Sequence, residues 1–209
     1  MQEPIEIIEV SPRDGLQNES AVVSTADKLE LIRRAADTGL RRIEVASFVH
    51  PLLVPQMADA EAIVAGLPPR DDVTWVGLVL NERGLQRALA TGGLSEIGCV
   101  AVAADGFGKS NQNQTVDQSV EVCRLLIQEA HAAGLRAQAT ISAAFGCPFD
   151  GDVAPERVVD VARRLAEVKP DEIALADTIG VAVPDEVSHL LRQVGAAVGP
   201  DVPLRVHFH

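Results

Sequence analysis

Short apolar runs alternate with amphipathic, helix-like stretches along almost the whole chain. The apolar runs predict seven β-strands, and the stretches between them predict six helices with apolar residues on one face. The strands are predicted at 5–10, 42–47, 73–80, 96–102, 137–143, 172–176 and 204–209. This alternation is typical of βαβ units, in which successive strands are parallel and the crossovers are right-handed.

Helix boundaries are also marked in the sequence. The first helix is predicted to begin near Thr25, with Ser24 as its N-cap and Asp27 three residues further on. Three predicted helices end in glycine followed by leucine, at 39–40, 93–94 and 134–135, and each is followed by a strand-like run. Glycine suits the left-handed conformation that often ends a helix.

The fold class that this pattern favours is α/β, specifically a (β/α)8 TIM barrel. A dinucleotide-binding sheet is disfavoured because no glycine-rich GxGxxG turn follows the first strand. We expect one catalytic barrel domain over residues 1–209, with about seven strands in this chain and apparent truncation at the C-terminal end, unless the eighth strand comes from elsewhere. The long loops, at 11–24, 49–56, 105–114 and 145–154, all follow strands, where barrels place their active sites.

Composition excludes several classes of protein. The chain has 47% hydrophobic residues but lacks an apolar run of membrane-spanning length, and its N-terminus resembles no secretory signal. A net charge of −12 argues against nucleic acid as a partner. The three cysteines form neither a CxxC pair nor an even set, so we expect reduced thiols and a cytoplasmic protein.

The last predicted strand carries candidate metal ligands. His207 and His209 are two residues apart, so both side chains lie on the same face of the strand. Asp14, in the loop after the first strand, is a candidate third ligand. Two imidazoles and one carboxylate suit a hard divalent ion such as Mg²⁺ or Mn²⁺, and neighbouring Arg13 is suited to stabilising an oxyanion on the substrate. Without partners elsewhere, the two histidines would be ordinary strand residues.

Several motifs together resemble the hydroxymethylglutaryl-CoA lyase family. They are Ser-Pro-Arg-Asp-Gly-Leu-Gln-Asn-Glu at 11–19, Ser-Phe-Val-His-Pro at 47–51, Val-Pro-Gln-Met-Ala-Asp at 54–59, Phe-Gly-Cys-Pro-Phe at 145–149, Asp-Thr-Ile-Gly-Val at 177–181 and His-Phe-His at 207–209. The Arg-Asp-Gly and His-x-His elements are shared with a wider superfamily of metal-dependent lyases and synthases. The Val-Pro-Gln-Met and Gly-Cys-Pro-Phe blocks resemble the lyase branch.

The resemblance implies cleavage of 3-hydroxy-3-methylglutaryl-CoA to acetyl-CoA and acetoacetate, as in leucine degradation and ketone-body formation. It also implies an acyl-CoA thioester as substrate, a divalent cofactor and a possible homodimer, while the charge and hydropathy given above predict no nucleic-acid or membrane partner. The family's catalytic cysteine and a further asparagine ligand belong to elements that this sequence does not include. The proton donor to the enolate is therefore not assigned.

The resemblance also implies roles for individual residues. Glu44 orients Arg13, whereas its alternative is an acid paired with Arg41 or Arg42. Asp177 is a proton shuttle or substrate ligand, and its alternative is a turn-forming or N-cap residue. We expect Cys147 to be a packed loop residue. The predicted catalytic residues are Arg13, Asp14, Glu44, Asp177 and His207; those at the substrate are Arg13, Gln17, Ser47, Asn111 and Thr178, with Asn113 a weaker candidate; the metal ligands are Asp14, His207 and His209.

Two other functions remain open. A synthase of the isopropylmalate or homocitrate type would use acetyl-CoA and a 2-oxo acid to form the carbon-carbon bond. An inactive fragment would keep the barrel surface without turnover.

Overall fold

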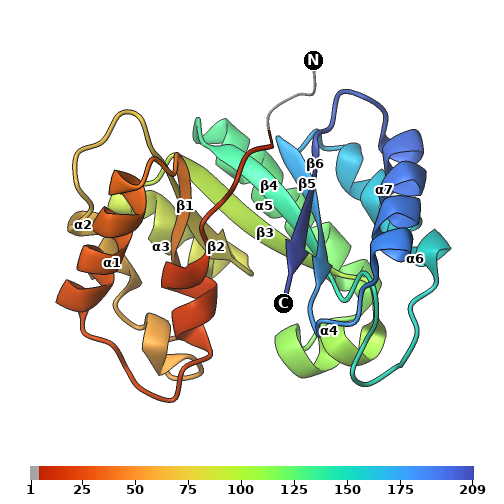
Figure 1. The fold of residues 1–209 in the computed structure, drawn as a ribbon, viewed down its shortest axis with the longest axis horizontal. Coiled ribbons are helices and arrows are strands. Elements are labelled where there is room, and N and C mark those ends of the chain that lie inside the picture. Colours follow the sequence, from red (N-terminus) through yellow and green to blue (C-terminus); the bar gives the residue numbers. More distant parts are fainter. Residues whose placement is uncertain (1–4) are drawn as a thin grey trace. The chain divides into compact units, whose positions relative to one another are not determined.

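The computed structural model describes residues 5–209, which form parallel strands alternating with helices (Figure 1). The elements in chain order are η1 (Ser11–Gly15), α1 (Thr25–Asp37), β1 (Arg42–Ser47), η2 (Pro55–Met57), α2 (Ala60–Ala65), β2 (Thr74–Val79), α3 (Glu82–Thr91), β3 (Glu96–Val102), α4 (Asp105–Gln112), α5 (Val116–Ala132), β4 (Arg136–Ser142), α6 (Pro155–Ala166), β5 (Glu172–Asp177), α7 (Pro184–Val198) and β6 (Leu204–Phe208). The sheet follows chain order from β1 to β6. The chain divides into two compact units, Met1–Ile97 and Gly98–His209.

In the first unit, β1 and β2 are paired in parallel. Their register runs from Arg42 opposite Thr74 to Ser47 opposite Leu78, with an irregularity between Glu44 and Ala46. Every residue of β1 is buried, which is expected of a parallel strand with covered faces. The core beside these strands includes Ile32 of α1, Ile63 of α2 and Leu85 of α3.

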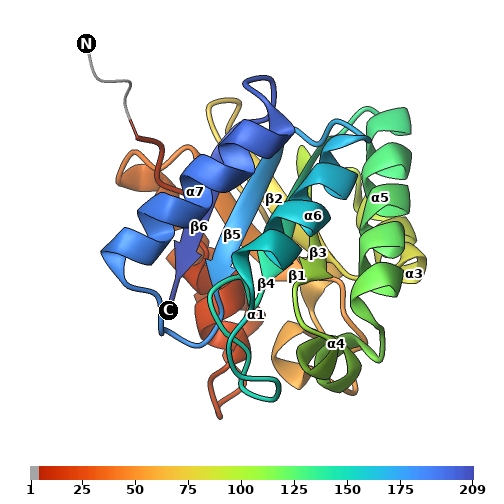
Figure 2. The same cartoon turned by 90° about the vertical axis from the view of Figure 1, so that its right-hand side faces the viewer.

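In the second unit, β4, β5 and β6 form consecutive parallel pairs. Helices α5, α6 and α7 cover one face of these strands, and α6 contacts α5 on one side and α7 on the other (Figure 2). Strands β4 and β5 bury all of their apolar side chains, including Ile141 and Ile173, whereas those of β6 are half-buried or exposed. The loops at the carboxyl ends of these strands are therefore anchored in a closely packed core.

The predicted helix boundaries are confirmed. Ser24 Oγ accepts a hydrogen bond from the Asp27 amide at 3.2 Å and donates one to the Asp27 carboxylate at 2.6 Å. Gly39 and Gly134 follow α1 and α5 with φ of +101° and +82°, and Gly92 caps α3 at +64°. Since side chains are strained at such angles, glycine ends these helices without steric strain.

Six of the seven predicted strands agree with the structure within two residues at either end. The first, predicted at 5–10, is wrong: in the described part of that segment only Glu9 pairs, through a single parallel bridge to Ile43. Ile5 and Ile7 are exposed by 92% and 69%. The alternation of apolar residues is present, but regular strand structure needs a hydrogen-bonded ladder on at least one side.

The loop predicted at 105–114 contains the additional helix α4, so the count of six helices was wrong. Two glycines and several polar residues concealed it, since these residue types have poor helix propensity. No helix within residues 5–209 combines the length and apolar character required to cross a bilayer.

Candidate active site

Arg13 and Asp14 lie on η1, a five-residue π-helical turn after the predicted first strand. The turn begins where the amides of Arg13 and Asp14 both donate to the Val10 carbonyl, at 3.1 and 2.6 Å. Asn18 closes the following turn by donating from Nδ2 to the Asp14 carbonyl at 2.9 Å. Short π-helical segments are found disproportionately at functional sites.

The Arg13 guanidinium is held between two carboxylates. Its Nε donates to Glu44 Oε1, and Nη1 donates to Asp14 Oδ1 at 2.7 Å. The side chains of Arg13, Asp14 and Glu44 are 13%, 13% and 5% exposed, so the charges are poorly screened by water. The alternative partners considered for Glu44, Arg41 and Arg42, instead pair with Asp72 and Glu96. The cluster presents an oriented cation whose remaining N–H groups can bind an anionic oxygen.

Two residues predicted to bind substrate have buried polar atoms without partners. In the part of the chain that the structure describes, Gln17 Oε1 and Ser47 Oγ make no hydrogen bond. Ser47 is the last residue of β1 and is fully buried. Since buried polar atoms in folded proteins are nearly always paired, an orphaned oxygen at a strand end suggests a polar group that is still to bind.

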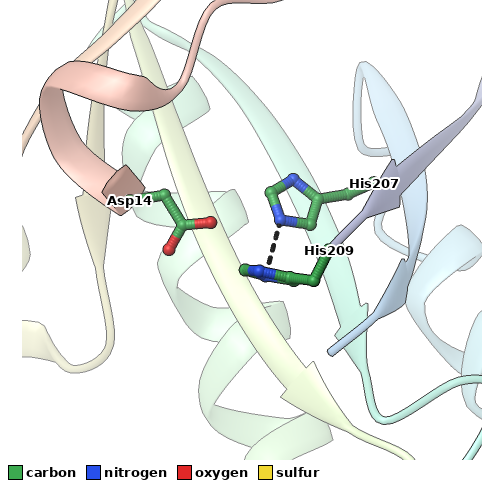
Figure 3. A group of neighbouring side chains, drawn as sticks. All are labelled: Asp14, His207 and His209. Carbon is green, nitrogen blue, oxygen red and sulfur yellow. Dashed lines mark hydrogen bonds between the residues drawn. The ribbon is translucent and has the colours of Figure 1, made fainter. Parts of the chain in front are cut away.

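His207 lies on β6 and His209 follows its last residue, and their Nε2 atoms are 3.1 Å apart (Figure 3). The two imidazole nitrogens are therefore close enough to contact one cation together, and their role as metal ligands stays a prediction. Asp14, also drawn in Figure 3, belongs to the other unit and offers a carboxylate, which is a favoured ligand of hard cations.

Asp177 ends β5 and is 3% exposed. Its two carboxylate oxygens accept hydrogen bonds from the amides of Val181 and Ala182, at 2.9 and 3.0 Å. These contacts match the turn-forming alternative, while its role as a proton shuttle stays a prediction. Thr178 Oγ1 accepts a hydrogen bond from the Ala143 amide at 2.8 Å, where Ala143 has a left-handed φ of +56°. The two residues thus fix the β5–α7 loop (residues 178–183) and the start of the β4–α6 loop (residues 143–154).

We expect Asp177→Asn to lower the free energy of unfolding by about 1 to 3 kcal/mol, because an amide cannot accept both backbone hydrogen bonds in the buried site. Urea denaturation measures this loss, and hydrogen exchange at 178–183 should become faster. Asp185→Asn, on the exposed first turn of α7, is the control. Unchanged unfolding of Asp177→Asn would contradict the turn-forming role and favour the proton shuttle.

The two remaining predicted residues lie on α4 or at its end. Asn111 is exposed on α4. Asn113 is the C-cap of α4 with φ of +54°, a conformation that asparagine tolerates better than most residues. Two cavities that lie within single units, of about 550 and 220 Å³, are lined by none of the predicted site residues.

All three cysteines are buried. Cys147 packs with Ala104 and Ala143, and its Sγ accepts hydrogen bonds from the amides of Phe149 and Asp150 at 3.4 and 3.3 Å. It is therefore a packed loop residue, as expected. The pKa of the Cys99 thiol is raised, mainly by a hydrogen bond with Cys123 and also by burial. The thiol therefore stays protonated and unreactive.

Sequence reasoning missed Lys28 and Gln56. Lys28 is only 2% exposed, and its ammonium contacts the loop that carries Gln56. On an amphipathic helix, a lysine among charged neighbours is normally a surface residue, because lysine is rarely buried without a partner. The only sequence signal was the acid Asp59, which lies 31 residues away.

Comparison with known proteins gives consistent results. The model of the HMGL-like family matches residues 4–209. Hydroxymethylglutaryl-CoA lyase of Pseudomonas mevalonii is 42% identical over 205 residues, which cover 98% of this chain and 67% of that protein. (R)-Citramalyl-CoA lyase of Chloroflexus aurantiacus is 40% identical over 218 residues, which cover 99% of this chain and 68% of that protein.

Among solved structures, the HMG-CoA lyase from Brucella melitensis superposes with a TM-score of 0.94 and 40% identity, covering all of this chain and 73% of that one. The likeness confirms the predicted α/β fold of the TIM-barrel class. The chain spans from 56 to 68% of the length of the curated relatives that it matches.

Proposed function

Because the chain belongs to the HMGL-like family, we propose that it is part of a lyase that cleaves 3-hydroxy-3-methylglutaryl-CoA to acetyl-CoA and acetoacetate. The observation that carries this proposal is the match to hydroxymethylglutaryl-CoA lyases over nearly the whole chain, at about 40% identity. Arg13, Asp14, Glu44, His207 and His209 lie within the matched region. The synthase alternative has no comparable support among these relatives.

As the resemblance to metal-dependent lyases implies, we propose that Asp14, His207 and His209 hold a divalent ion, Mg²⁺ or Mn²⁺. The donor set supports this assignment, since one carboxylate and two imidazoles suit a hard divalent cation that would also bind substrate oxygens. When bound, the ion supplies positive charge that lowers the pKa of the substrate's tertiary hydroxyl and orients that group.

The reaction requires one proton removal and one bond cleavage. The hydroxyl loses its proton, its carbon becomes a ketone, and the bond to the carbon next to the thioester breaks. The electron pair of that bond goes to the thioester half as an enolate, which takes up a proton to give acetyl-CoA. Arg13 is held by Glu44 and Asp14 in one orientation, so its free N–H groups can meet the enolate oxygen without rearrangement. Gln17 and Ser47 supply buried oxygens for polar groups of the substrate.

The test is release of acetoacetate from 3-hydroxy-3-methylglutaryl-CoA by the purified protein with Mg²⁺ or Mn²⁺. We expect product in the presence of the metal and its loss on addition of a chelator. Absence of acetoacetate from a folded, metal-saturated protein would contradict the lyase activity and favour the inactive fragment. Consumption of a 2-oxo acid together with acetyl-CoA would favour a synthase.

A second substrate is favoured by the 40% identity to (R)-citramalyl-CoA lyase. The same bond cleavage in a citramalyl thioester would release a 2-oxo acid, so comparing kcat/KM for the two thioesters separates these specificities. A homodimer, a cytoplasmic location and a role in leucine degradation stay predictions from the resemblance.

A further inference from the structure

Lys28 is a buried lysine in the first turns of α1. Its Nζ lies 2.6 Å from Asp59 Oδ1 and donates a hydrogen bond to the Gln56 carbonyl. The second carboxylate oxygen of Asp59 accepts a hydrogen bond from Thr25 Oγ1 at 2.7 Å. The Asp59 carbonyl accepts a hydrogen bond from the Ile63 amide in α2. These contacts fasten the start of α1 to the β1–α2 loop (residues 48–59).

The β1–α2 loop in turn holds the segment that carries Asp14. Gln56 donates from Nε2 to the Glu19 carbonyl at 2.8 Å, and neighbouring Asn18 donates to the Asp14 carbonyl at 2.9 Å. Hydrogen bonds therefore connect Lys28, through Gln56, to the segment that follows η1. All of these residues belong to the first unit.

Two further observations make this connection more than ordinary packing. The π-helical turn η1 has five residues, too few to hold one conformation without outside support. A buried ion pair is a poor route to stability alone, because apolar residues of similar volume often stabilise a protein as well or better. A lysine and a carboxylate instead fix the direction of several backbone groups at once.

We propose that Lys28 and Gln56 are positioning residues, which hold η1 so that the Asp14 carboxylate is preoriented for the metal; this role rests on the metal site proposed above. Neither residue touches the metal or substrate in this assignment. Their effect passes through the backbone of residues 14–19, as outer partners act on the groups that bind a metal.

The experiment compares Lys28→Met and Gln56→Met with the wild-type protein. Both changes remove a hydrogen-bond donor with little change in volume, and Gln56→Met removes no charge, so it should fold even if Lys28→Met folds poorly. Matched controls are Arg33→Met, which removes an exposed cation from the same helix, and Gln86→Met, at an exposed position of α3. Titration with Mn²⁺ well below the unfolding temperature measures metal affinity, and hydrogen exchange reports the opening of residues 11–24.

We expect Mn²⁺ to bind about tenfold more weakly to Lys28→Met and to Gln56→Met, with faster exchange at 11–24 and neither change in the controls. The variant that carries both changes should bind Mn²⁺ only slightly more weakly than either single variant, because Lys28 and Gln56 act through the same chain of hydrogen bonds. Wild-type Mn²⁺ affinity with normal exchange at 11–24 in Gln56→Met would overturn the proposal, even if Lys28→Met were less stable. If the wild-type protein bound no Mn²⁺, the metal site would fail, while the exchange measurement would still decide whether Lys28 and Gln56 hold the segment.

Discussion

Replacement of Arg13 by methionine is expected to lower kcat for thioester cleavage by about a hundredfold or more. Loss of a single preoriented donor to a developing oxyanion typically has an effect of this size in a water-poor site. Arg13 is only 13% exposed, and its two carboxylate partners hold the side chain in one orientation. The guanidinium therefore does not have to rearrange before it binds the oxyanion. The measurement is steady-state release of acetoacetate, with kcat and KM determined separately at saturating Mn²⁺.

Two further variants show whether the charge or its geometry matters. Arg13→Lys keeps the charge but loses the planar fork that binds Glu44 and Asp14 together, so most of the loss should remain. Arg41→Met removes an arginine whose side chain is 50% exposed and should leave kcat unchanged. A wild-type kcat in Arg13→Lys, or an equal loss in Arg41→Met, would contradict the role assigned to Arg13.

Replacement of Arg42 by methionine is expected to destabilise the fold by about 3 to 5 kcal/mol. Arg42 and Glu96 are 2% and 0% exposed, and Arg42 Nε lies 3.1 Å from both oxygens of the Glu96 carboxylate. Removing the cation leaves a carboxylate in an interior where its charge is poorly solvated. The free energy of unfolding, measured in urea at neutral pH, gives the size of the loss.

The corresponding double variant, Arg42→Met with Glu96→Leu, distinguishes the buried charge from lost packing. Since it removes both charges of the Arg42–Glu96 pair, it should be more stable than Arg42→Met alone. If both variants were equally unstable, packing of the Arg42 side chain rather than its ion pair would account for the loss. Arg70→Met, which removes an arginine from an exposed pair with Asp72, should change stability by less than about 1 kcal/mol.

The strands and helix caps could be predicted because their signals are local. Each apolar run that forms β1 to β6 is long enough to predict a strand from its own residues alone. The helix cap formed by Ser24 and Asp27 likewise spans only four residues. The segment at 5–10 shows the limit of such signals. Its alternating pattern describes which side chains are apolar, but not whether a partner strand runs alongside, and only Glu9 has one.

The site was predictable where its residue types carry the chemistry. The His207 and His209 pair followed from strand geometry, and the Arg13 contact with Glu44 followed from resemblance. The hydrogen bonds of Asp177 were foreseen only as the turn-forming alternative, because their partners depend on how the next five residues turn back toward the strand. Buried Lys28 was missed for the same reason, since its partners come from a loop about thirty residues away whose path the sequence pattern does not describe.

The burial of every cysteine makes the thiols reporters of local opening. Cys99 and Cys123 lie within the core of the second unit, between β3 and α5, so a thiol reagent reaches them only when that packing opens. Cys147 sits in the β4–α6 loop, where a smaller fluctuation exposes its sulfur. The rates at which a reagent modifies the three thiols would therefore rank the local opening reactions around them by free energy. No cysteine would have to be introduced by mutation.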